Sequence, residues 1–239
     1  MLDLNCDMGE VEKTWLNGRD QELMTYLDSI NISCGFHAGN ERLIRQTISK
    51  AAELDLNIGI HPGFDDPENF GRKELPLSSD SLSDLLKKQF DRFLKWSDEE
   101  GAIINHIKAH GALYNLLARD AELSLVYLQV IRGYNPNWVV FGLPESQTAK
   151  AANNQNQPFW PEAFADRTYT DKGALTPRSE KGALIEDPEK AYNQVKDILE
   201  KGNVMSNNNT RIDLKAKTFC IHGDGPKALE IAQRLQNLR

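Results

Sequence analysis

Residues 101–115 read GAIINHIKAHGALYN, and their pattern decides the fold. The stretch opens with apolar residues, after which His106, Lys108 and His110 alternate with their neighbours. Side chains two positions apart in a strand point to the same side, so these three groups would project into one space. Gly111 breaks the alternation, and helical spacing follows. The stretch therefore predicts a strand that delivers polar side chains at its C-terminal end.

The same change from strand-like to helical spacing recurs along the whole chain. Strands are expected at residues 2–6, 29–34, 57–61, 101–110, 137–142, 158–164 and 217–222. Helices are expected at residues 19–28, 40–54, 80–100, 112–117, 120–132, 145–153, 188–201 and 226–237. Asn40 and Asp80 are candidate N-caps.

Three connections are expected to be loops: residues 8–18, residues 166–187 and the asparagine-rich run between the last predicted helices. The second is long for a compact domain, and loops of that length often act as lids. Pro161 makes the segment 158–164 the weakest predicted strand, because proline cannot donate a hydrogen bond to a central ladder.

Strands that alternate with helices favour parallel pairing, either in an open doubly wound sheet or in a closed barrel. Polar residues lie at or just after the ends of six predicted strands: Asp7, His37, His61, His110, Glu162 with Asp166, and His222 with Asp224. A barrel brings all these strand ends to one mouth, whereas an open sheet gathers only those near a switch point. Composition does not shift along the chain. We therefore predict a single domain over residues 1–239, folded as a distorted (β/α)7 TIM-like barrel.

Composition and charge limit the classes of function. The formal net charge is −7 and no basic cluster is present, which argues against nucleic acid as a partner. The longest apolar runs are far shorter than the roughly 20 residues of a membrane span. The N-terminus lacks the basic start and apolar core of a signal peptide. Three widely spaced cysteines do not suggest a disulfide framework, so we expect a cytoplasmic protein.

Four of the five histidines stand beside glycine or proline just after a predicted strand, in FHAG, HPG, AHG and IHG. A single histidine of this kind is usually structural, but four at matching positions favour a shared functional cluster. His106 lies deeper along its strand and is expected to support the site. Asp7, His37 and His61 could bind Zn²⁺ or a similar ion, but their spacing does not require a metal. A tightly bound transition metal is the less expected alternative.

Acidic and amide side chains that would point into the barrel or its mouth are Asp3, Asn5, Asp7, Glu10, Glu162 and Asp166. Cationic side chains that could bind an anionic substrate are Arg72, Lys108, Arg167, Arg178 and Lys181. The phosphate-binding motifs GxxxxGK[ST] and GxGxxG are absent. The cysteines are expected to pack as small apolar side chains.

Seven ordered segments resemble the LamB/YcsF family. They are DLNCDMGE at 3–10, NISCGFHAG at 31–39, IGIHPGFDD at 58–66 with FGRKE at 70–74, HIKAHGALYN at 106–115, EAFADRTY at 162–169, LTPRSEKGALI at 175–185 and CIHGD at 220–224. The chain departs from the family pattern at Ala109, where proline is usual, at Asn40, where an acidic residue is usual, and after Glu10, where a glycine-rich run is usual. These departures bear on specificity more than on fold.

The resemblance implies a glycoside hydrolase/deacetylase-like barrel. It also implies ATP-dependent hydrolysis of 5-oxo-L-proline to L-glutamate, with the chain as the A component of a 5-oxoprolinase that includes subunits B and C. Mg²⁺ would accompany the ATP. Because the chain has no P-loop, ATP would be bound in an unusual way or mainly by a partner subunit.

For this reaction the expected catalytic residues are Asp7, His37, His61, His110 and Glu162. The expected substrate- or phosphate-binding residues are Asn5, Arg72, Lys108, Arg167, His222 and Asp224. Two alternatives remain open. One is a stand-alone amide hydrolase or deacetylase that uses a divalent metal, and the other is a non-catalytic component that only binds ligand.

Overall fold

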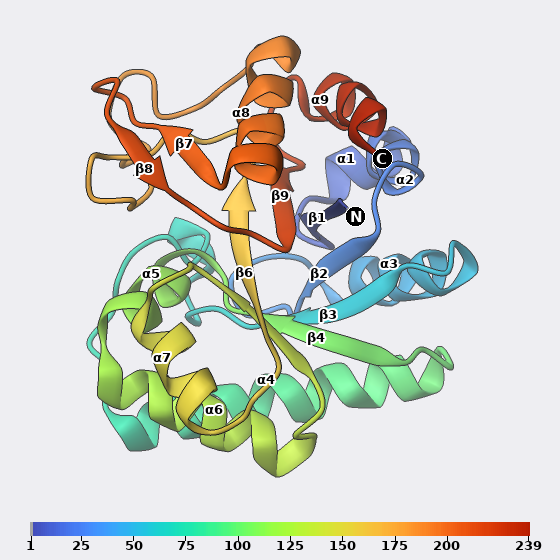
Figure 1. The fold of residues 1–239 in the computed structure, drawn as a ribbon. Coiled ribbons are helices and arrows are strands. Elements are labelled where there is room, and N and C mark those ends of the chain that lie inside the picture. The colour runs from blue at the N-terminus through green and yellow to red at the C-terminus, as the bar shows by residue number, and fades with distance from the viewer. Residues whose placement is uncertain (1) are drawn as a thin grey trace.

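The computed structural model describes residues 2–239 and contains a closed barrel of seven parallel strands (Figure 1). The strands follow one another around the barrel in the order β1 (Asp3–Met8), β2 (Ser29–Ser33), β3 (Asn57–His61), β4 (Ile104–Lys108), β5 (Val139–Gly142), β6 (Phe159–Phe164) and β9 (Thr218–His222). β9 pairs with β1 and closes the ring. The predicted (β/α)7 barrel is confirmed, and the open sheet is excluded.

Helices cover the outside of the barrel (Figure 1). They are α1 (Glu12–Leu16), α2 (Arg19–Met24), α3 (Glu41–Glu53), α4 (Ser79–Glu99), α5 (Gly111–Arg119), α6 (Ala121–Tyr134), α7 (Gln147–Asn154), α8 (Pro188–Lys201) and α9 (Ala228–Leu235). Asn40 caps α3 by accepting a hydrogen bond from the Leu43 N–H, as predicted. The predicted cap of α4 was wrong by two residues, because Ser78 accepts from the Ser81 N–H and Asp80 lies inside the helix. No helix within residues 2–239 is both long and apolar enough to cross a membrane.

Three local expectations were wrong. Helix α1 lies within the predicted loop 8–18, and a hairpin of β7 (Asn203–Met205) and β8 (Arg211–Asp213) lies within the predicted asparagine-rich loop. The third is Pro161, which lies in a full strand between β5 and β9. Its carbonyl still accepts a hydrogen bond from the Lys217 N–H, so the proline removes a single donor from the ladder.

Two layers of buried side chains differ sharply in polarity. Outward-facing strand residues such as Leu4, Ile30, Ile107 and Phe219 are buried with the helices in one hydrophobic core. Most inward-facing residues are polar instead, including the fully buried Asn5, Ser29, Asn31, Glu162 and Thr218. The hydrophobic effect therefore stabilises the shell outside the barrel, while hydrogen bonds must satisfy its interior.

Gly59 leaves the space that the His106 ring occupies inside the barrel. A Cβ atom at Gly59 would lie 2.2 Å from His106 Nε2, closer than any real contact. That nitrogen is 2.8 Å from Asn31 Oδ1, and the ring stacks on Phe141 with centroids 4.1 Å apart. The ring is therefore held from two other sides and has little freedom to move away.

We expect Gly59→Ala to lower the free energy of unfolding by about 1–3 kcal/mol or more, because it overpacks this contact. Urea unfolding measures the change. Gly133→Ala in α6 is the matched control, since a Cβ there meets nothing within 4 Å. It should be neutral or stabilising, as alanine favours a helix over glycine by about 0.5–1 kcal/mol. Equal stability of the two variants would contradict the close contact.

Candidate functional site

A cavity of about 450 Å³ opens at the mouth of the barrel, where the C-terminal ends of the strands meet. The side chains that matter for its chemistry are the acids Asp7, Glu10 and Asp224, the cations Arg72, Lys108, Arg167 and Arg178, and the histidines His110 and His222. Part of its wall comes from the long connection after β6, which includes Thr176 and Pro177. This connection is tied back on itself by isolated bridges between Arg167 and Leu184 and between Tyr169 and Leu175.

Lys108 is the central cation of the site, at the end of β4. Its Nζ lies 2.9 Å from Asp7 Oδ1 and 2.9 Å from Glu162 Oε1. It also lies 3.3 Å from Asn5 Oδ1 and 3.1 Å from Cys220 Sγ. Burial acts to lower the pKa of Lys108, but the neighbouring groups Asp7, Cys220 and Glu162 together outweigh it and hold that pKa well above its usual value. The ammonium group is therefore charged at neutral pH although it is 2% exposed.

Asp7 links this ammonium to the histidines. Its Oδ1 accepts hydrogen bonds from Lys108 and from Asn31 Nδ2, the latter at 2.9 Å, and its Oδ2 lies 3.3 Å from His61 Nε2. Burial acts to raise the pKa of Asp7, but His61 and Lys108 hold it well below its usual value. Asp7 is thus an ionised carboxylate that faces the cavity.

Deeper in the barrel, a hydrogen-bond network holds these groups in place. Asn5 Nδ2 donates to Glu162 Oε1 at 3.0 Å and to Thr218 Oγ1 at 2.6 Å, and Asn5 Oδ1 accepts from Asn31 at 2.8 Å. Asn31 Oδ1 in turn contacts His106. Burial lowers the pKa of His106 to about 3, so its ring is neutral. His106 is a supporting residue, as the sequence indicated.

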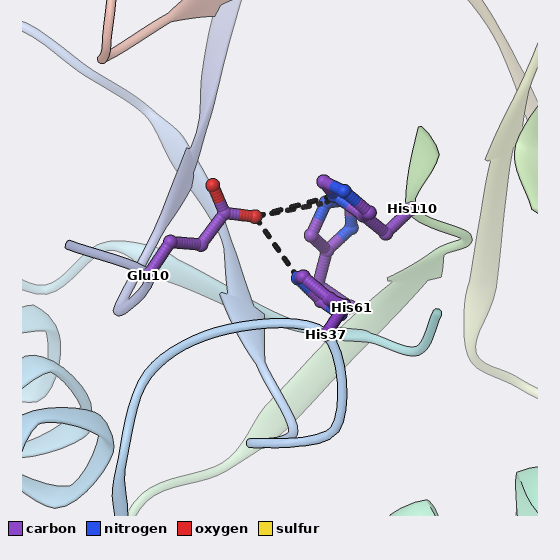
Figure 2. A group of neighbouring side chains, drawn as sticks. All are labelled: Glu10, His37, His61 and His110. Atoms are coloured by element: carbon purple, nitrogen blue, oxygen red, sulfur yellow. Dashed lines mark hydrogen bonds and ion pairs between the residues drawn. The ribbon is translucent and has the colours of Figure 1, made fainter. Parts of the chain in front are cut away.

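Four residues from four different segments form a second cluster, which we call the histidine cluster: Glu10, His37, His61 and His110 (Figure 2). Glu10 Oε1 lies 3.1 Å from His37 Nε2, 3.2 Å from His110 Nδ1 and 3.8 Å from His61 Nε2. The His37 and His110 rings stack with centroids 3.8 Å apart, and His61 meets both at nearly right angles. All three histidines are buried.

His222 pairs with Asp166 on another part of the wall. Its Nδ1 lies 2.9 Å from Asp166 Oδ1, and its backbone N–H donates to Oδ2 at 2.8 Å. Because a carboxylate only accepts, His222 Nδ1 carries the proton and its Nε2 is left for the cavity. Asp224, close to it in sequence, instead forms an ion pair with Arg72 at 2.9 Å.

Two guanidinium groups face the cavity near one another, from Arg167 and Arg178. Burial and the charge of Arg178 lower the pKa of Arg167. Arg167 Nη2 donates to the Thr176 carbonyl at 2.7 Å, but its buried Nε has no partner among residues 2–239. A buried donor beside a second cation favours an anionic ligand.

The predicted site residues thus all lie at the mouth or just below it, but in different groupings from those expected. The proposed metal set is divided: His37 and His61 lie with Glu10 and His110, whereas Asp7 forms a separate group with Cys220 and His222. Lys181 does not line the cavity.

Sequence reasoning missed the roles of two residues, Asn31 and Cys220, and the partners of a third, Glu10. Asn31 could have been found, because it alternates with Ser29 and Ser33 on a short strand and must share their face. Cys220 was expected to pack as an apolar residue, yet its Sγ contacts Lys108. Glu10 was expected at the barrel or its mouth, but only the fold shows that its side chain reaches the histidines.

Comparison with known proteins agrees with this fold. The model of the LamB/YcsF family matches residues 2–238. The A component of 5-oxoprolinase from Bacillus subtilis (strain 168) is 41% identical over 235 residues, which cover 98% of this chain and 91% of that protein. The protein of the same name from Bacillus cereus (strain ATCC 10987) is 39% identical over 235 residues, which cover 98% of this chain and 93% of that protein. The crystal structure of the lactam utilization protein from Thermus thermophilus superposes with a TM-score of 0.90 at 30% identity, covering 99% of this chain and 96% of that one.

Proposed function

The chain belongs to the LamB/YcsF family, and from that premise we propose that it opens the lactam ring of 5-oxo-L-proline by hydrolysis. We further propose that the reaction depends on ATP and is carried out with partner subunits B and C. One observation supports this most directly. The cavity places a carboxylate and an ammonium, Asp7 and Lys108, in one space with the guanidinium groups of Arg167 and Arg178.

The substrate is a five-membered lactam that carries one carboxylate. Arg167 and Arg178 suit that carboxylate, because a guanidinium donates two parallel hydrogen bonds to it. The buried Arg167 Nε would gain the partner that it lacks among residues 2–239. A lactam anchored there would direct its carbonyl toward Lys108 and Asp7 at the floor of the cavity.

Hydrolysis requires a new C–O bond from water and cleavage of the C–N bond of the lactam. In this proposal Asp7 accepts the proton of the attacking water, and the Lys108 ammonium stabilises negative charge on the carbonyl oxygen. His222 in its doubly protonated form, with Nδ1–H held by Asp166, would give its Nε2 proton to the departing nitrogen, and the proton taken up by Asp7 would later replace it. The products are the second carboxylate and the amine of L-glutamate, which take up one water. In the ATP-dependent reaction the γ-phosphoryl group would pass from ATP to the lactam oxygen and, after the ring opens, to a second water, so that ADP and phosphate are released.

ATP, together with Mg²⁺, would supply the free energy that drives opening of a stable five-membered lactam. The cavity fits phosphate oxygens in part, since Arg72, Arg167 and Arg178 line its wall. These residues would contact the phosphates, and the absence of a P-loop leaves the rest of the nucleotide to a partner subunit.

The test is glutamate formation from 5-oxo-L-proline by the purified chain, alone and combined with its partner subunits, with and without ATP. We expect product only with the partners and ATP. Arg167→Met should raise KM for the lactam by about tenfold or more, since a hydrogen bond to a charged group contributes about 1.5–3 kcal/mol. Lys172→Met, an exposed cation outside the cavity, is the matched control. Turnover by the chain alone without ATP would contradict the proposal and favour a stand-alone amide hydrolase.

A further inference from the structure

The histidine cluster carries an inference that does not depend on the proposed reaction. We propose that Glu10, His37, His61 and His110 together bind one divalent transition-metal ion of the zinc class. The ligand atoms are Glu10 Oε1, His37 Nε2, His61 Nε2 and His110 Nδ1, which belong to four side chains whose donor atoms lie within 4.8 Å of one another (Figure 2).

The spacing of these atoms matches a four-coordinate ion. Zinc–ligand bonds of about 2.0–2.1 Å in a tetrahedron place neighbouring ligand atoms roughly 3.3 Å apart. Glu10 Oε1 lies 3.1 Å from the His37 atom and 3.2 Å from the His110 atom, and His110 Nδ1 lies 3.0 Å from His61 Nε2. The distance from Glu10 to His61 is longer, at 3.8 Å. These four distances suit one ion, although the stacked rings of His37 and His110 would have to tilt to aim at it.

Hydrogen bonds on the far side of two rings fix the position of one proton on each ring and leave the other nitrogen facing the centre. His61 Nδ1 lies 2.7 Å from the Lys108 carbonyl, and His110 Nε2 lies 2.9 Å from the Phe70 carbonyl. A carbonyl only accepts, so each of these nitrogens carries the proton. The opposite nitrogens, His61 Nε2 and His110 Nδ1, face one another 3.0 Å apart, so the two of them cannot both carry a proton and at least one is an acceptor. A backbone carbonyl behind a histidine is the usual arrangement around a metal ligand.

At the centre of the histidine cluster, hydrogen-bond acceptors outnumber hydrogen-bond donors. Glu10 Oε1 and Asp7 Oδ2 add two carboxylate oxygens to the ring acceptor. The carboxylates of Asp7 and Glu10 draw positive charge to the centre of the histidine cluster. Lys108 pairs with Asp7, and burial acts to lower the pKa of His110 while Glu10 raises it above its usual value. A divalent cation compensates both the carboxylate charge and the ring acceptor, as a buried site requires.

The donor set selects the class of ion. Three imidazole nitrogens and one carboxylate oxygen suit Zn²⁺, Fe²⁺, Co²⁺ or Mn²⁺ rather than Mg²⁺ or Ca²⁺, which prefer oxygen ligands alone. The stacked His37 and His110 rings would have to tilt apart, because parallel rings cannot aim their lone pairs at one point. Glu10 and His110 also line the cavity, so the ion would lie at its wall.

The test is direct measurement of bound metal in the full chain, without turnover. We expect about one Zn²⁺ per chain by mass spectrometry of elements after dialysis, and tetrahedral absorption bands when Co²⁺ is added to the apoprotein. Glu10→Gln and His110→Asn should each weaken Zn²⁺ binding by at least about a hundredfold. Mutating a residue that only hydrogen-bonds to a metal ligand already lowers metal affinity by about 10–100-fold, and loss of the ligand itself should cost at least as much. Circular dichroism checks that each variant remains folded.

His222→Asn is the matched control, a histidine of the same cavity outside the histidine cluster. It should keep full metal content. The competing group of Asp7, Cys220 and His222 contains a thiol, so an ion bound there would give sulfur-to-cobalt charge-transfer absorption. That absorption, or loss of metal in His222→Asn alone, would overturn the proposal. So would a folded wild-type chain that binds none of the four ions at micromolar concentration and shows His110 as an imidazolium by nitrogen NMR. Because none of these readouts requires glutamate formation, their failure is distinguishable from failure of the proposed function.

Discussion

Replacing Asp7 by Asn is expected to lower kcat for glutamate formation by about 10²–10⁴-fold, the range typical for loss of a general base. The amide has nearly the same shape and can still accept from Lys108 and Asn31, which now contact Oδ1 of the carboxylate. It cannot accept the proton of an attacking water. It also removes the negative charge that lies 3.3 Å from His61 Nε2. The loss should therefore appear in kcat rather than in KM for the lactam.

The measurement is steady-state glutamate formation by the chain with its partner subunits. Asp197→Asn is the control, because that carboxylate pairs with Lys201 on the exposed face of α8, away from the cavity. It should leave kcat unchanged. An Asp7→Asn variant that keeps more than about a tenth of wild-type kcat would assign the role of base to another group.

Replacing Lys108 by Met is expected to lower the free energy of unfolding by about 3–5 kcal/mol, the cost of leaving a buried charge without its partner. The ammonium is the common neighbour of Asp7 and Glu162, and it is almost completely buried. Methionine fits the space of the side chain but leaves the two carboxyl groups facing each other across it. Catalysis should be lost as well, since the charge that stabilises the carbonyl oxygen is gone.

Urea unfolding measures the loss of stability in Lys108→Met, and a rescue experiment shows whether unpaired carboxylates cause it. Adding Asp7→Asn and Glu162→Gln to Lys108→Met removes both unpaired carboxylates, so the triple variant should regain much of the lost stability. Lys201→Met is the control for loss of a surface ion pair and should cost no more than about 1 kcal/mol. If the triple variant is less stable than Lys108→Met alone, the destabilisation comes from lost packing or hydrogen bonds and not from unpaired charge.

Asp7→Asn tests catalysis and Lys108→Met tests stability, although both residues belong to one hydrogen-bonded network. Asp7 contacts both the ammonium of Lys108 and the ring of His61, so it joins the charged centre of the barrel to the histidine cluster. The network is possible because the barrel interior is polar, whereas the apolar core lies outside it. Stability and chemistry thus depend on different layers of the same strands.

The sequence by itself determined the barrel and the residues at its mouth. His106 and Lys108 are two residues apart, and side chains two apart in a strand share a face, so the sequence alone shows that they point the same way. The same holds for the seven alternations of strand and helix, and for the histidines placed just after strands beside glycine or proline. Local rules failed at Pro161, because a closed barrel pairs every strand on both sides and one missing donor is tolerated there.

Only the tertiary structure decided which of these residues act together. The sequence suggested Asp7 with His37 and His61, but the fold places Glu10 at the centre of the histidines and turns Asp7 toward Lys108. Contacts between side chains far apart in the chain depend on the stagger and tilt of neighbouring strands. Those quantities are set by packing of the whole barrel and leave no local signal in the spacing of residues. The sequence thus identifies which residues lie at the mouth, while the contacts between their side chains form only when the barrel closes.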